Sequence, residues 1–193
     1  MTDMPTMTDR IRQERWLQLY YYTRTAFSML WVGAAFSAGR HSPAAASILL
    51  VVYPLWDALA NYVDAARSGG LAANRTQAIN AAVSLATAVA VVLALRMGMN
   101  WVLGVFGVWA IFSGLLQLGT AIKRWKSFGA QWAMILSGAQ SALAGSFFIA
   151  QARMPMPLTV TTVAGYALFG AVYFFISALW LSVSRRRASA QMP

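Results

Sequence analysis

Long apolar stretches, separated by short polar or basic segments, dominate the pattern along the chain. Six of them are long enough, or nearly so, to cross about 30 Å of hydrocarbon as a helix, which takes about 20 residues. They lie at residues 17–37, 43–63, 76–95, 100–122, 131–150 and 158–182. Runs such as 81–95 are continuously apolar and lack the period-two alternation of a membrane β-barrel strand. The pattern predicts an all-α integral membrane protein with six transmembrane helices.

The composition points to the same class. The chain has 193 residues, of which 59% are hydrophobic and 10% charged, against roughly 25% charged residues in a soluble domain. A soluble protein of this size could not bury so much apolar surface, which excludes disordered, fibrous and secreted disulfide-linked classes. The chain has no cysteine, which also excludes thiolate metal sites and cysteine nucleophiles.

A net charge of +10 can indicate nucleic-acid binding, but the placement of the basic residues indicates membrane topology instead. Eleven of the fifteen Lys and Arg residues flank apolar stretches and form no single basic face. We therefore expect membrane topology and no nucleic-acid partner. The four clusters are Arg10/Arg12/Arg15, Arg67/Arg75, Lys123/Arg124/Lys126 and Arg185/Arg186/Arg187.

All four clusters fall on one side of the membrane in the six-span assignment. The opposite side carries Arg40, Arg96, Arg153 and the single histidine, His41. The positive-inside rule then places both termini in the cytoplasm. Residues 1–16 are interpreted as a cytoplasmic segment with a short juxtamembrane helix, 17–182 as the membrane domain, and 183–193 as a basic cytoplasmic tail.

The membrane domain contains an internal repeat. A shift of 56 residues places the second helical hairpin on the first, and a further shift of 57 places the third on the second. These shifts superpose Arg40, Arg96 and Arg153, each at the end of the first helix of its hairpin. The second helices share an aromatic-x-aliphatic-aromatic element: Tyr53/Leu55/Trp56, Trp109/Ile111/Phe112 and Tyr166/Leu168/Phe169. We predict three repeated hairpins, at about 17–67, 76–124 and 131–182, around a pseudo-threefold axis along the membrane normal.

Two glycine-rich segments carry a family resemblance: 107–114, Gly-Val-Trp-Ala-Ile-Phe-Ser-Gly, and 165–170, Gly-Tyr-Ala-Leu-Phe-Gly. They resemble the HdeD-type acid-resistance membrane proteins, which are built from a short hydrophobic repeat. The first hairpin departs from the pattern, with Asp57 and Ala58 in place of Ser113 and Gly114. The resemblance implies a multi-pass protein of the bacterial inner membrane linked to survival in acid, and it supplies no catalytic residues.

Arg24 and Asp57 are the most informative charged residues within the spans. Arg24 lies about 17 residues before the turn near residue 41 and Asp57 about 16 after it. In an antiparallel hairpin both therefore sit at one depth, about 24 Å from that turn at 1.5 Å per residue. We predict an ion pair, which neutralises both charges in the membrane. It serves either as part of a proton or ion relay or as a structural pair that holds the first hairpin together.

Further polar residues extend this candidate binding patch. Asn61 shares a helix face with Asp57 and Asp64, and the repeat alignment superposes it on Gln117 and Arg24 on Asn80. The seam is either a water-filled vestibule or ligand pocket, or a set of interhelical hydrogen bonds. Two ladders of small residues predict close helix contacts within the bundle or between subunits: Ala82/Ala86/Ala90/Ala94 and Ser137/Ser141/Gly145.

No phosphate-binding loop, nucleophile triad, pair of catalytic carboxylates or metal-ligand cluster appears in the sequence. We therefore expect neither an enzyme nor a cofactor or metal site. The expected function is a structural or regulatory role in acid or envelope stress. The alternatives are a small transporter or channel, and an accessory subunit of a membrane complex. Expected partners are membrane lipids, with Arg40, Arg96 and Arg153 as candidate headgroup contacts, and a second copy or another membrane protein.

Overall fold

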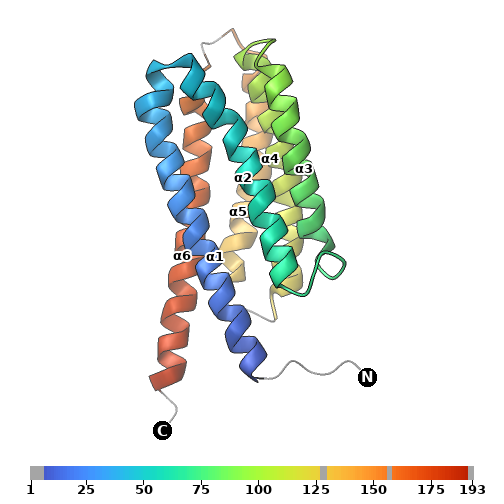
Figure 1. Ribbon diagram of the computed structural model, residues 1–193, viewed down its shortest axis with the longest axis vertical. Coiled ribbons are helices and arrows are strands. Elements are labelled where there is room, and N and C mark those ends of the chain that lie inside the picture. The colour runs from blue at the N-terminus through green and yellow to red at the C-terminus, as the bar shows by residue number, and fades with distance from the viewer. Residues whose placement is uncertain (1–6, 127–129, 156–157, 191–193) are drawn as a thin grey trace.

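A computed structural model describes residues 7–126, 130–155 and 158–190, and the side chains of 11–187 within these ranges. These ranges contain six long α-helices in an elongated bundle (Figure 1). A π-helical turn, η1, continues α1. The elements are α1 (Met7–Ala34), η1 (Ala35–Gly39), α2 (Pro43–Arg67), α3 (Arg75–Ala94), α4 (Met99–Arg124), α5 (Gln131–Gln151) and α6 (Val160–Ala190).

The local sequence explains where α2 begins and where α3 ends. The Ser42 hydroxyl accepts a hydrogen bond from the Ala45 backbone N–H at 3.2 Å, and Pro43 occupies the first turn of α2. Gly98 adopts a φ of 114° between α3 and α4, a conformation that favours glycine. Such short connections make successive helices antiparallel.

Five helices, α2 to α6, are long and apolar enough to cross a membrane. The chain is therefore a multi-pass integral membrane protein. The first predicted span, in α1, does not meet the same criterion of length and composition, because Arg24, Gln18 and three consecutive tyrosines make that helix more polar. The six-span arrangement therefore stays a prediction at its first helix.

The first and last helices, α1 and α6, extend further than the predicted spans. The sequence analysis divided the chain at residues 16 and 182, but α1 begins at Met7 and runs unbroken past residue 17, and α6 continues to Ala190. The N-terminal segment and the basic tail are thus largely helical continuations of α1 and α6. Residues 1–6 and 191–193 of these two predicted segments lie outside the described ranges.

The helices form a ring in chain order, and α6 closes it by packing along α1 (Figure 1). The more extensive contacts join successive hairpins, α2 with α3, α4 with α5 and α6 with α1, and fewer contacts join the two helices of each hairpin. The first turn of α1 and the last turn of α6 lie at the same end of the bundle. We call this the terminal end and the other the distal end. The antiparallel order brings all four basic clusters to the terminal end.

Two apolar clusters fill the ring. The larger, in the distal half, includes Trp31, Leu50, Phe106 and Phe148. A smaller cluster in the terminal half joins α1, α4, α5 and α6. The buried polar side chains include Asp57, Asn61, Asp64, Gln77 and Asn80. They lie in the terminal half, beside the smaller apolar cluster, so the terminal half combines apolar and polar contacts.

The closest helix contact is that of α4 with α5, where glycines allow the two backbones to approach. A Cβ atom on Gly107 would lie 2.8 Å from the Gly145 carbonyl oxygen, and one on Gly114 would lie 2.6 Å from that of Gly138. Both pairs are seven residues apart on each helix, so they fall on one face of each. The predicted Ser137/Ser141/Gly145 ladder is buried in this contact. The alanine ladder of α3 differs, since Ala82 and Ala86 are exposed.

Candidate functional site

Arg24 and Asp57 form the predicted ion pair, with side chains 13% and 6% exposed. Asp57 also accepts hydrogen bonds from the Asn61 amide at 2.9 Å and the Ser84 hydroxyl at 2.8 Å. Arg24 donates to the Tyr20 hydroxyl at 3.1 Å. Side chains from α1, α2 and α3 thus meet at one buried carboxylate, which is the arrangement that a charge needs in a low-dielectric interior.

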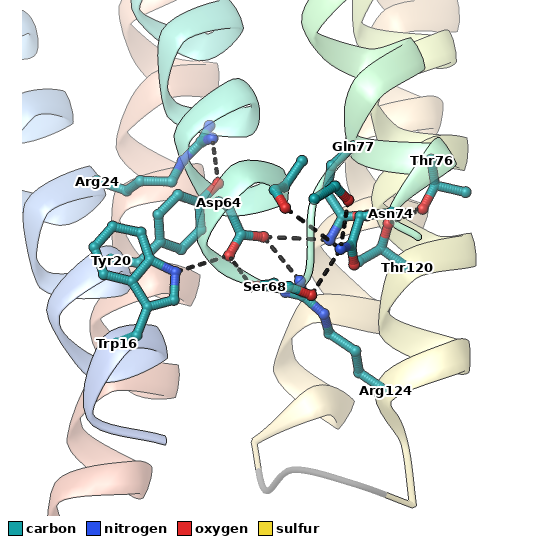
Figure 2. A network of polar contacts seen from close by, with 12 residues as sticks. Trp16, Tyr20, Arg24, Asp64, Ser68, Asn74, Thr76, Gln77, Thr120 and Arg124 are labelled. Atoms are coloured by element: carbon teal, nitrogen blue, oxygen red, sulfur yellow. Dashed lines mark hydrogen bonds and ion pairs between the residues drawn. The ribbon is translucent and has the colours of Figure 1, made fainter. Parts of the chain in front are cut away.

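A second carboxylate network lies nearer the terminal end, around Asp64, which is 2% exposed (Figure 2). Arg124 of α4 approaches one Asp64 oxygen at 3.0 Å, and the Gln77 amide donates to the same oxygen at 3.2 Å. The other oxygen accepts from the Trp16 indole N–H at 3.1 Å and the Ser68 hydroxyl at 3.2 Å. This cluster joins α1, α2, α3 and α4 at one point.

Two threonines extend the second network towards α4, as Figure 2 shows. The Thr76 hydroxyl donates to the Gln77 amide oxygen at 3.0 Å and accepts from the Thr120 hydroxyl at 2.8 Å. Arg67 lies over the Trp16 ring, 4.6 Å from its centroid, on the α1 side. Charged and polar contacts therefore join α1 to α4 in the terminal half, beside the smaller apolar cluster.

Two small cavities, each of about 40 Å³, lie inside the ring beside these networks. Arg24, Asp57, Gln117 and Phe174 line both cavities. Each has room for water, since a single molecule needs about 10–15 Å³ of such volume. Asn80 lines the first cavity, and its buried amide oxygen has no hydrogen-bond partner among the described residues. The Arg24 Nε is a second buried polar atom without one there.

An aromatic layer bounds the second cavity. Tyr53, Trp109 and Tyr166 line it, and their rings make edge-to-face contacts with centroid distances of 5.8 Å from Tyr53 to Trp109 and 6.2 Å from Trp109 to Tyr166. These are the three positions that the repeat alignment superposes. The Trp109 indole N–H donates to the Ser84 hydroxyl at 2.9 Å, which links this layer to the Asp57 network.

All five residues of the predicted polar patch lie together at the first cavity: Arg24, Asp57, Asn61, Asn80 and Gln117. Gln117 donates to the Met134 carbonyl oxygen at 3.4 Å. The other three predicted residues, Arg40, Arg96 and Arg153, lie in the distal connections, after η1, α3 and α5. Arg40, Arg96 and Arg153 are all exposed.

The sequence analysis missed the pairing of Asp64 with Arg124. The sequence placed Asp64 only on a shared helix face, and Arg124 was interpreted as part of a basic cluster that sets the membrane topology. The sequence could have predicted this pairing. Counting residues from the turns, as for Arg24 and Asp57, also places Asp64 and Arg124 near the terminal end. Among the described residues no group of three or more His, Cys, Asp or Glu could hold a metal ion.

A family model described as "Short repeat of unknown function (DUF308)" matches residues 79–150. The matched segment runs through most of α3, all of α4 and nearly all of α5, and includes Asn80, Trp109 and Gln117. HdeD-type proteins carry this repeat, so the match agrees with the resemblance at the level of the repeat. The chain matches no curated protein and no solved structure.

Proposed function

We propose that this protein is a non-enzymatic component of the bacterial cytoplasmic membrane that helps the cell to survive acid or envelope stress, as HdeD-type proteins do. The observation that carries the proposal is the DUF308 match over residues 79–150. In the proposed arrangement three hairpins cross the membrane six times and both termini are cytoplasmic. The four basic clusters at the terminal end support that orientation, and the meeting of Tyr53, Trp109 and Tyr166 supports the threefold repeat.

The geometry favours a structural or regulatory role over conduction. The two carboxylates at the terminal half are paired with arginines and take further hydrogen bonds. The apolar distal cluster includes Tyr53 and Trp109 of the aromatic layer and fills the ring there. A bundle closed in this way keeps the membrane sealed. It acts through contacts with lipids, with a second copy or with another membrane protein.

The test is survival of a deletion strain after acid shock. The strain is complemented with wild type, with the Arg24→Ala/Asp57→Ala double variant, or with Lys126→Gln, a control at an exposed position. Loss of survival on deletion, rescued by all three at equal protein level, supports the proposed role and makes the ion pair structural. Deletion without a phenotype overturns the stress role.

A small transporter or channel is the second candidate, favoured by the two polar cavities that share Arg24, Asp57 and Gln117. Rescue by wild type and Lys126→Gln but not by the double variant would shift the assignment to this candidate. Flux into proteoliposomes then decides: conduction is abolished by Asp57→Asn and retained by Lys126→Gln. Absence of flux in the wild type contradicts this candidate.

A further inference from the structure

An apolar groove of about 950 Å³ opens on the outer surface of the bundle, between α3, α4 and α5. Its lining includes the small residues Ala86 and Ala90 of α3 and Gly104 of α4. Val108 and Trp101 of α4 also line it and are 48% and 57% exposed, so the groove faces outward. In a bilayer this surface is filled by lipid or by another protein, because an outward-facing apolar groove does not stay empty in hydrocarbon.

The distal end of the groove is polar and basic. Asn100, at the start of α4, and Arg153, just after α5, line it there. The Asn100 amide donates to the Ala152 carbonyl oxygen at 2.9 Å. The Arg153 guanidinium makes no hydrogen bond or ion pair with any residue that the structure describes. None of the described residues that line the groove is acidic. A cation at one end of an apolar groove matches a ligand with an anionic head and an apolar tail.

The length of the groove indicates whether its occupant is a lipid or a helix of another protein. Along α4 its lining runs from Asn100 to Phe112. Twelve residues of helix rise about 18 Å, whereas the hydrocarbon core is about 30 Å thick. The groove therefore covers about one leaflet. A transmembrane helix of a second copy would need a contact surface along the whole span, whereas an acyl chain needs a single leaflet.

We propose that this groove binds a phospholipid with an anionic headgroup in the leaflet at the distal end. One acyl chain lies along Gly104 and Val108, and Arg153 holds the headgroup phosphate. A guanidinium suits this task because its planar set of donors matches phosphate oxygens. This role is proposed for Arg153 and not for Arg40 or Arg96, because those two residues do not line the groove. It does not depend on the role in acid stress.

The experiment is native mass spectrometry of the full chain in mild detergent, titrated with phosphatidylglycerol or with phosphatidylcholine of the same acyl chains. The wild type is expected to retain one phosphatidylglycerol with clear preference. Arg153→Gln is expected to weaken that binding about tenfold, as the loss of one charge-assisted contact implies, and Arg40→Gln is the matched control. Equal effects of both arginine variants would indicate a nonspecific lipid layer and overturn the proposal.

The groove itself is tested by filling it. A Cβ on Gly104 would lie 4.0 Å from the Ala152 Cβ, an ordinary contact, whereas Gly165 has nothing within 4 Å. Gly104→Leu is expected to abolish retention of both lipids, and Gly165→Leu, at an exposed position of α6, to leave it unchanged. Ala90→Leu fills the groove from α3 if Gly104→Leu does not fold. Undiminished retention in a folded filled variant, or a dimer that the filled variant disrupts, overturns the proposal.

Discussion

At the scale of single residues, the chain pairs two buried carboxylates, Asp57 and Asp64, with the arginines Arg24 and Arg124. Asp57 and Asp64 each have an arginine partner and at least two further donors. A buried ion pair gives little net stability relative to an apolar pair of similar shape, but removal of one partner leaves a charge without compensation. The two networks therefore specify which helix faces meet.

A double-mutant cycle on Arg24 and Asp57 tests this view. Asp57→Ala is expected to lower the free energy of unfolding by about 3–5 kcal/mol, because it leaves the Arg24 charge buried and unpaired. The Arg24→Ala/Asp57→Ala double variant is expected to lose less than the sum of the two single variants. The measurement is unfolding in detergent, and losses that simply add would contradict a coupled pair.

At the scale of helices, small residues decide which elements approach closely. The contact of α4 with α5 brings Gly107 against Gly145 and Gly114 against Gly138, which is the small-residue packing typical of membrane helices. Ala86 and Ala90 of α3, in contrast, line the outer groove. Small residues thus form a tight helix interface in one place and an open groove in another.

Gly114→Ala is expected to force α4 and α5 apart. The new Cβ would lie 2.6 Å from the Gly138 carbonyl oxygen, and overpacking of this kind costs about 1–3 kcal/mol. The matched control is Gly165→Ala on α6, where the structure places nothing within 4 Å. This change is expected to be neutral or to stabilise the helix by up to about 1 kcal/mol. Thermal unfolding midpoints in detergent compare the two, and equal midpoints would contradict the close contact.

At the scale of the whole molecule, the ring places both termini at one end, with the basic clusters beside them (Figure 1). The polar networks lie in the terminal half and the larger apolar cluster in the distal half. Of the six helices in the described ranges, α1 alone falls short of the composition expected for a span, and it carries Arg24 and Trp16, one member of each network. Whether α1 crosses the membrane is therefore the central question of topology.

Cysteine labelling answers this question cleanly, because the chain has no cysteine of its own. Single cysteines replace Arg12, Lys126, His41 or Met97, and a membrane-impermeant maleimide is added to intact spheroplasts. The variants at 41 and 97 are expected to react at once, and those at 12 and 126 only after permeabilisation. Reaction at 12 without permeabilisation would show that α1 does not cross, and the cysteine-free wild type controls for background.

Much of this architecture follows from the sequence by itself. Hydropathy and the fixed rise of a helix are local properties, so they predicted the helices of 43–67, 75–94, 99–124 and 131–151 closely, and the start of the helix of 160–190. The same arithmetic predicted the Arg24–Asp57 pair, because depth depends only on the number of residues from a turn. The gathering of Asn61, Asn80 and Gln117 at the same cavity followed from the repeat alignment.

Other features depended on how each helix is rotated about its axis and which neighbour it meets. The pairing of Asp64 with Arg124, the closure of α6 on α1 and the glycine contacts of α4 with α5 join residues far apart in the chain. Hydropathy carries no such information, because lipid and the protein interior are equally apolar. For the same reason only the tertiary structure separated Arg153, at the end of a groove, from Arg40 and Arg96.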